Sequence, residues 1–161
     1  MLLVPFEDSD CELLASWIIT AEFNMLWGGP RYQWPLTREQ ILQHHSDLAV
    51  HPFMVTADRQ KIGFIELYQR AEQEVRLCRV LIAQHSARGQ GLGRLLIRQA
   101  VEHARCRLGA RFVSLAVFER NEAAFNCYRA EGFQIVRRDT DARQFAGDVW
   151  PLIYMAKQLE A

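Results

Sequence analysis

Hydrophobic and polar positions along the chain change period several times, and each change marks a predicted element. Three successive segments, Pro52–Ala57, Lys61–Tyr68 and Glu74–Ala83, are rich in the apolar and β-branched residues of strands. Short polar stretches separate them, at Asp58–Gln60 and Gln69–Gln73. Because strands joined by short turns pair antiparallel, these segments predict an antiparallel meander.

A helical period follows the meander. Leu92, Leu96, Ala100 and Ala104 fall on one stripe, and Gly109 is the residue expected to end that helix. The next strand is predicted over 111–118. A helix between two strands makes them parallel neighbours, so a strand–helix–strand unit should lie at the centre of the sheet.

The remaining elements are predicted from caps and breakers. Two capping boxes, at Ser9–Glu12 and Thr37–Gln40, predict helices that run to about Phe23 and about Leu48. Asn121 can cap a short helix that stops at Gly132. The other predicted elements are strands over 2–4, 133–138 and 149–156, and an aromatic, Gly/Pro-broken connection over 25–35.

This order, βααβββαβαββ, predicts an α/β fold with a mixed, mostly antiparallel central sheet flanked by helices. The 161 residues fit one domain, and we expect a single domain over residues 1–161. Ligands of open sheets tend to bind where the carboxyl ends of strands meet the N-termini of helices.

Composition and charge exclude several classes of protein. The formal net charge is zero, so no basic surface indicates nucleic acid binding. No apolar run approaches the roughly 18–20 residues that span a bilayer, so we expect no membrane partner. The four cysteines show no C-x-x-C spacing, so no metal site is predicted. Scattered cysteines without a signal peptide indicate reduced thiols and a cytoplasmic location.

A glycine-rich turn between the third meander strand and the helix predicts anion binding. Glycines let an anion approach the backbone, and the free N–H groups of the helix start point at it. A dinucleotide site would need a third glycine where Arg94 stands, and a P-loop would need Gly-Lys-Ser/Thr. A plain strand-to-helix connection remains the alternative.

Two motifs resemble the signatures of the GNAT superfamily of acetyl-CoA-dependent N-acetyltransferases. Arg88-x-x-Gly91-x-Gly93 after a strand is similar to the acetyl-CoA loop of that family. The segment from Asn121 through Tyr128 to Gly132-Phe133 is similar to its second signature. The resemblance extends over about residues 52–159 and implies a GNAT-like fold.

The resemblance implies direct transfer of an acetyl group from acetyl-CoA, as co-substrate, to a primary amine of a small molecule. A protein or peptide acetyltransferase and a non-catalytic acyl-CoA sensor remain alternatives. Homodimers are common in the family, so a homodimer is a further expectation. The residues that the resemblance assigns to the coenzyme are Leu81, Ile82, Ala83, Arg88, Gly89, Gln90, Gly91, Leu92, Gly93, Arg94, Asn121 and Asn126.

Tyr128 matches the acid of the family, because a phenol is protonated at neutral pH and can protonate the departing thiolate. A core tyrosine is the alternative. Glu66, amid apolar residues of a predicted central strand, is the candidate base or amine ligand, since a buried carboxylate must be paired or face a cleft. A solvent-facing Glu66, Glu119 as base and a chain of waters stay open.

The resemblance implies an acceptor wall in the first two helices and their connection. Trp27, Tyr32 and Trp34 could clamp a cation there, although core or dimer contacts fit aromatic residues equally well. Glu22, Glu66 and Glu119 could recognise a cationic acceptor such as a polyamine, an aminoglycoside or a peptide amine.

Overall fold

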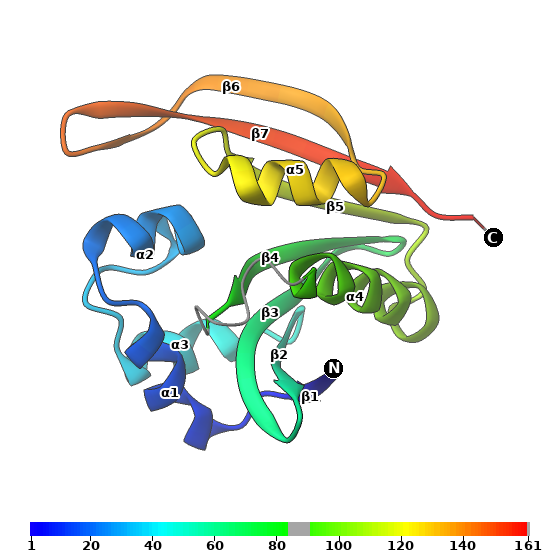
Figure 1. Cartoon of the computed structure of the whole chain (residues 1–161), viewed down its shortest axis with the longest axis horizontal. Coiled ribbons are helices and arrows are strands. Elements are labelled where there is room, and N and C mark those ends of the chain that lie inside the picture. Colours follow the sequence, from blue (N-terminus) through cyan, green and yellow to red (C-terminus); the bar gives the residue numbers. More distant parts are fainter. Residues whose placement is uncertain (84–90, 161) are drawn as a thin grey trace.

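The computed structural model describes residues 1–83 and 91–160. Within them lies one seven-stranded sheet with the order β1-β2-β3-β4-β5-β7-β6 (Figure 1). The strands are β1 (Leu2–Pro5), β2 (Val50–Ala57), β3 (Gln60–Ala71), β4 (Glu74–Ile82), β5 (Phe112–Phe118), β6 (Gln134–Phe145) and β7 (Asp148–Gln158). The helices are α1 (Cys11–Trp17), α2 (Ala21–Gly28), α3 (Arg38–His45), α4 (Leu92–Leu108) and α5 (Glu122–Ala130), with 3-10 turns η1 (Asp8–Asp10) and η2 (Gly29–Arg31).

The sheet is mixed and mostly antiparallel, as the sequence predicts. Among the strands of the described residues, only β4 and β5, which are joined through α4, pair in parallel. The hairpin between β2 and β3 turns at Asp58 and Arg59, with φ of 50° and 67°. Two left-handed residues match the right-handed twist of the strands, and this confirms the predicted turn.

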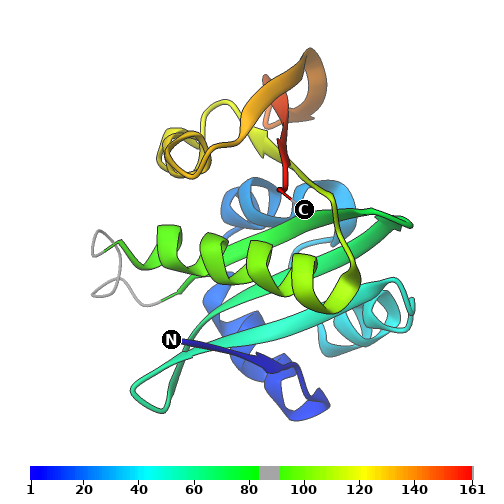
Figure 2. The ribbon, with the colours of Figure 1, turned by 90° about the vertical axis from the view of Figure 1, so that its right-hand side faces the viewer.

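Helices cover both faces of the sheet. Figure 2 shows α4 lying across one face, where Leu96, Ile97 and Ala100 pack on the buried side chains of the central strands. The other face carries Met54 and Phe64, which pack under α1, α2 and α3. No helix within residues 1–83 and 91–160 is both long enough and apolar enough to cross a membrane.

The first predicted helix is wrong in extent, because two helices stand in its place. The first ends at Trp17, and Thr20 begins the second by accepting a hydrogen bond from the N–H of Phe23 at 3.0 Å. The reciprocal cap forms between Glu7 and Asp10, two residues earlier than predicted. β-branched residues at 18–20 favour leaving the helix, so the chain has one helix more than the predicted order.

Several strands and one helix end at other residues than predicted. The third helix begins after Thr37 as expected but ends at His45, three residues early. β3 continues to Ala71, and β6 and β7 form a long hairpin where the sequence indicated a connection. Exposed, polar residues fill most of β6, so no hydrophobic alternation marks it as a strand.

Gly63 lies where the backbones of β3 and β4 come close together. A Cβ at this position would stand 2.2 Å from the carbonyl oxygen of Leu81, on the strand that leads to α4. The contact is with backbone, so a side chain at residue 63 requires the strand to move.

We expect Gly63→Ala to destabilise the fold by about 1–3 kcal/mol, the usual cost of overpacking. The midpoint of urea unfolding measures this effect. Gly93→Ala is the matched control, because its Cβ meets only the Cys127 sulfur at 3.8 Å, and alanine favours the helix. Equal stability of the two variants would contradict the close approach at Gly63.

Candidate active site

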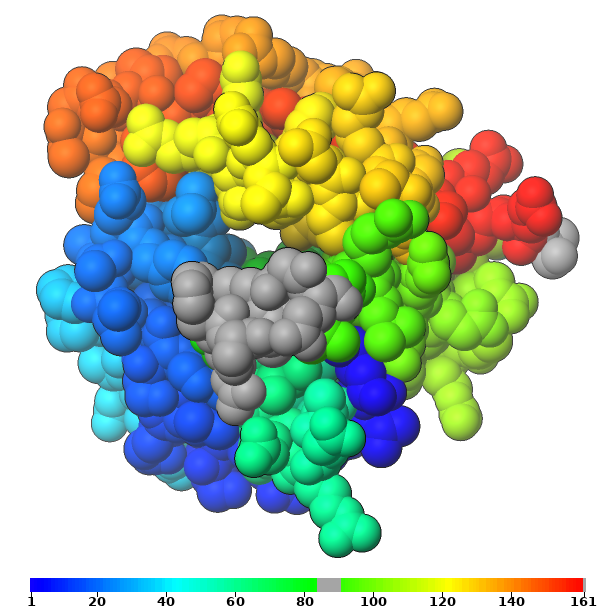
Figure 3. Space-filling model, in the orientation of Figure 1, coloured from blue at the N-terminus to red at the C-terminus, as the bar shows by residue number. Residues whose placement is uncertain are grey.

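A fork between β4 and β5 opens a cleft in the sheet. The strands pair only from Glu74 to Leu77, opposite Phe112 to Leu115. Beyond these residues they separate, as Figure 1 shows, while β4 stays paired to β3 and β5 to β7. A cleft of about 500 Å³ lies there, and Figure 3 shows the surface hollowed between α2 and α5.

β4 carries a β-bulge beside the fork. The register of β3 shifts between Phe64 and Glu66, so one residue of β3 faces both Arg79 and Val80 of β4. Arg79 has a left-handed backbone with φ of 51°, which is costly for a side chain of this kind. The indole N–H of Trp27 donates to the Arg79 carbonyl oxygen at 2.9 Å and holds the bulge from α2.

Glu66 is the centre of a buried charged cluster. Arg79 donates from Nε to Oε2 at 2.6 Å and from Nη2 to Oε1 at 3.0 Å, and His44 Nε2 lies 2.6 Å from Oε1. Burial raises the pKa of Glu66, but the Arg79 charge and the hydrogen bonds from His44 and Arg79 outweigh it and lower that pKa. Glu66 is therefore an ionised carboxylate with both oxygens in use.

The structure brings Glu66 to the cleft but not to its surface. His44 and Arg79 line the cleft, and the fully buried Glu66 lies behind them. Sequence reasoning missed both partners. A buried carboxylate requires a cation, and this rule could have led to Arg79 on the neighbouring strand. His44 comes from a helix 22 residues away, and no local pattern links it to Glu66.

Tyr128 lines the cleft from α5 and is 7% exposed. Burial, followed by the neighbouring Cys127 and Cys78, raises the pKa of its phenol, so the proton is retained at neutral pH. Asn121 also lines the cleft, and its side chain accepts from the N–H of Ala124 at 3.4 Å as the cap of α5. The cap and a coenzyme contact are compatible roles for this residue.

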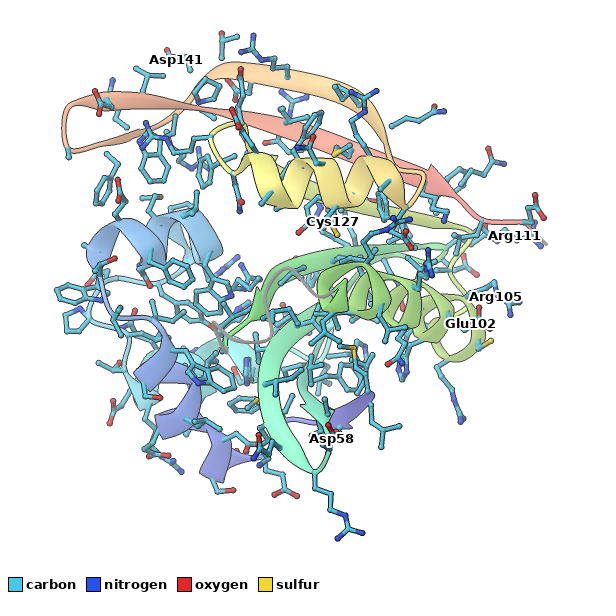
Figure 4. The ribbon with its side chains drawn as sticks, viewed as in Figure 1. Asp58, Glu102, Arg105, Arg111, Cys127 and Asp141 are labelled. Carbon is cyan, nitrogen blue, oxygen red and sulfur yellow. The ribbon has the colours of Figure 1, made fainter. Side chains whose placement is uncertain are left out.

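No side chain of the described residues caps the start of α4. Gly91 precedes the helix in a left-handed conformation, and it has no side chain to cap the first N–H groups. Leu92 packs against the core, and Gly93 lies beside Cys127, which Figure 4 shows on the side of α5 that faces α4. A forked strand edge, followed by a helix start that no described side chain caps, fits an extended, anionic coenzyme such as acetyl-CoA.

Other residues predicted to bind the coenzyme lie around this helix. Arg94 donates to the buried carboxylate of Glu131 at 2.8 Å, with its side chain 48% exposed. Asn126 is exposed and does not line the cleft. Arg88, Gly89 and Gln90 lie outside the described residues.

The strand that leads to α4 ends with Leu81 and Ile82, and Ala83 follows it directly. Leu81 is buried, and the N–H of Ala83 donates to the Ile62 carbonyl at 2.7 Å. The backbone of this segment is therefore held in an extended form along β3. No group of His, Cys, Asp and Glu side chains in residues 1–83 and 91–160 has an arrangement that could hold a metal ion.

Of the aromatic residues predicted for the acceptor wall, Trp27 lines the cleft directly. Tyr32 stacks on it with 6.0 Å between ring centroids and is 4% exposed. Its hydroxyl is buried without a hydrogen-bond partner in the described chain. Trp34 is 46% exposed and lies outside the cleft lining.

Solved structures similar to this chain share its fold. A spermidine N-acetyltransferase from Vibrio cholerae, in complex with CoA and spermine, matches with a TM-score of 0.83 and 19% identity, over 98% of this chain and 94% of that chain. The smu.2055 protein from Streptococcus mutans UA159 matches with a TM-score of 0.78 and 18% identity, over 99% and 100%. A dodecameric form of the Vibrio enzyme gives 0.76 and 20%, over 98% and 92%.

A family model places the chain more specifically. The model of the acetyltransferase (GNAT) family matches residues 17–133, which include α2, the whole β2–β3–β4 meander, α4, β5 and Tyr128. The two motifs that resemble this family lie within that range or at its border. The chain belongs to the GNAT acetyltransferase family and is an acetyl-CoA-dependent N-acetyltransferase.

Proposed function

We propose that this enzyme acetylates a primary amine of a small molecule by direct attack on the acetyl donor. The observation that carries the proposal is the fork between β4 and β5, which forms one cleft with Tyr128 on its wall. On the acceptor side, α2, η2 and the β6–β7 hairpin all contribute to the lining, from Leu26 to Arg31 and at Arg143. A walled cleft suits a small acceptor better than a peptide, which needs an open groove.

Acetyl-CoA supplies an acetyl group activated as a thioester. We assign its binding to the backbone of 81–83, to the start of α4 at Gly91–Gly93 and, with their positive charge, to Arg88 and Arg94. Gly89, Gln90, Leu92, Asn121 and Asn126 complete the proposed set. Because Glu131 already holds Arg94, that arginine adds only part of its charge to an anion.

Tyr128 is the proposed acid. Its raised pKa keeps the phenol protonated throughout the neutral range, so the hydroxyl can donate to the sulfur as negative charge develops there. The phenol already carries its proton at neutral pH, so no neighbouring group has to supply one before the reaction. Mere binding of the coenzyme would not require this hydroxyl.

His44 is the proposed acceptor of the amine proton, and Glu66 is the residue that positions it. Glu66 binds Nε2 of His44, which leaves Nδ1 as the basic nitrogen. Glu66 itself is a poor base, because Arg79 stabilises its ionised form from the other side. Glu66 therefore contributes to proton transfer only by positioning His44.

Trp27, Tyr32 and Trp34 are the aromatic residues that we assign to the acceptor. Trp27 has the direct role, as part of the cleft lining. Tyr32 supports Trp27 by stacking on it. Trp34 contributes only if the acceptor extends beyond the cleft.

Tyr128→Phe should lower kcat by about 100-fold or more, the usual contribution of a positioned acid. Free-thiol release from acetyl-CoA over a panel of amines measures kcat, and calorimetric titration measures the affinity for acetyl-CoA. The affinity should be unchanged, because phenylalanine fills the same volume at the wall.

Two results bear on the alternatives. Full turnover in Tyr128→Phe would rule out the acid role. Tight binding of acetyl-CoA by the unmodified enzyme without thiol release from any amine would favour a sensor.

Glu66→Gln should destabilise the fold by about 3–5 kcal/mol at pH 7, because it leaves Arg79 buried without a counter-charge. The lowered pKa of Glu66 adds a pH dependence. The stabilisation that ionised Glu66 provides is complete above about pH 4.3, the ordinary pKa of a glutamate. It is lost as the pH falls through the lower pKa of Glu66 in the folded protein. Urea unfolding at pH 7 and pH 3 should therefore show a gap between the two proteins that narrows in acid.

Glu119→Gln is the control for this experiment. Its ion pair with Arg138 is nearly half exposed, with side-chain exposures of 42% and 49%. Exposed pairs contribute about 0–1 kcal/mol, so the control should unfold like the unmodified enzyme at both pH values. A loss at Glu119 as large as that at Glu66 would contradict the assignment.

A further inference from the structure

The charges on the acceptor side of the cleft are unbalanced. Within the part of the chain that the structure describes, the charged residues that line it are Arg31, His44, Asp47, Arg76, Arg79 and Arg143. Glu66 neutralises Arg79 from behind the wall, at 2.6 Å. Three arginines then face the single carboxylate of Asp47, so this end of the cleft attracts negative charge.

Arg76 is the most informative of these arginines. It lies on β4 opposite Tyr68 of β3, and its guanidinium carbon stands 5.8 Å from the ring centroid of Tyr154 on β7. Its Nε is buried and has no hydrogen-bond partner, and no carboxylate of the described chain lies within ion-pair distance of it. A buried donor on a charged side chain is costly to leave unused, and it indicates an anion that a ligand supplies.

The carboxylate two residues away on the same face of the strand has other partners. Glu74, two residues before Arg76, accepts from Ser114 at 2.9 Å and from Arg70 at 3.2 Å. Both bonds are accepted by one oxygen of Glu74, and Glu74 is not among the described residues that line the cleft. Glu74 therefore forms an ion pair with Arg70 and none with Arg76 in the described chain.

Arg76 also stands close to the expected reaction centre. It pairs with Ser114, one residue before the last paired position of the fork at Leu77. Two residues further along β4, about 7 Å away at the usual strand rise, Cys78 lines the cleft with Tyr128. When Arg76 binds the anionic group of a compact acceptor, the amine of the same molecule reaches the fork.

We propose that the acceptor is an amine that also carries an oxyanion, a carboxylate or a phosphate, and that Arg76 binds this group. Arg31 and Arg143 are exposed at the rim and add positive charge there. The inference rests on the proposed transfer of an acetyl group to a small amine. It names the chemical class of the substrate for that same site.

A polycationic acceptor fits the cleft less well. The glutamates that the sequence indicated for it are all paired with arginine: Glu22 with Arg120 at 3.8 Å, Glu66 with Arg79, and Glu119 with Arg138. None of the three is among the described residues that line the cleft. A polyamine would meet guanidinium groups without a matching set of carboxylates, and like charges at close range repel.

The test compares amines that differ only in the anion. The probes are the common L-amino acids with their carboxamides, phosphoethanolamine with ethanolamine, and spermidine, each assayed for thiol release from acetyl-CoA by the full-length enzyme. We expect at least one anionic amine to exceed its uncharged partner by about tenfold or more in kcat/KM. The carboxylate and phosphate arms tell the two oxyanions apart.

Arg76→Gln assigns the preference to this residue. It should raise KM for the anionic amine by about 10- to 100-fold, the range of a hydrogen bond to a charged group, and leave the uncharged partner nearly unchanged. Arg143→Gln, at an exposed position, should have a smaller effect in the same direction. Arg105→Gln is the control, because Arg105 pairs with Glu102 on the outer side of α4, far from the cleft (Figure 4).

The outcomes separate this inference from the proposed function. Preference for spermidine or for the uncharged amines, or an Arg76→Gln effect equal on both members of a pair, would overturn the inference and leave acetyl transfer intact. Thiol release from no amine would contradict the proposed function, and calorimetric binding of the same amines then decides the inference. Binding of an anionic amine that Arg76→Gln abolishes would support it, and equal binding of both partners, or of neither, would overturn it.

Discussion

The buried ion pair between Glu66 and Arg79 is the interaction on which the site depends. Neither charge is tolerable alone in that position, since an uncompensated buried charge costs several kcal/mol. The bidentate contact draws the Arg79 side chain toward β3 just where its backbone is left-handed. With the Arg79 carbonyl bound by Trp27 and Glu66 bound by His44, one pair connects β3, β4, α2 and α3. The bulge, the cleft wall and the imidazole are thereby positioned together.

On the other side of the fork, a second buried carboxylate holds α5 against α4. Glu131, just after α5, binds Arg94 and Arg98 of α4, and its carbonyl oxygen accepts from Lys157 of β7. Burial raises the pKa of Glu131, but the hydrogen bonds and charges of the two arginines lower it overall, so the carboxylate is ionised. These contacts hold α5, and with it Tyr128, against α4. Because β4 and β5 share only four residue pairs in the described chain, other contacts must hold the two sides of the fork in place. The ion pairs of Glu66 and Glu131 provide them.

The sequence predicts the parts of this arrangement that depend on local patterns. The meander, the parallel unit through α4, the turn at Asp58 and the cap at Asn121 follow from period and capping, and each is present. The break after Trp17 and the long β6–β7 hairpin do not follow, because β-branched residues in a helix and polar residues in a strand give no periodic signal. The pairing of Glu66 is non-local. It depends on a register shift in β4 and on a helix from another part of the chain, and neither is encoded by spacing alone.

Features of the backbone govern the donor chemistry, whereas individual side chains govern the choice of acceptor. In the proposed mechanism acetyl transfer uses the fork, the start of α4 and one tyrosine as acid, and the backbone of the fold positions all three. The proposed acceptor site is formed by side chains that the backbone does not dictate. Arg76 is an example, because the pleat of β4 fixes the face of the strand on which it lies but not the charge of the side chain. Under the proposed assignment one fold serves acceptors of opposite charge, and similarity of fold to spermidine N-acetyltransferases says little about the amine. The balance of charges around the cleft is the stronger guide to substrate, because electrostatic complementarity acts on the acceptor itself.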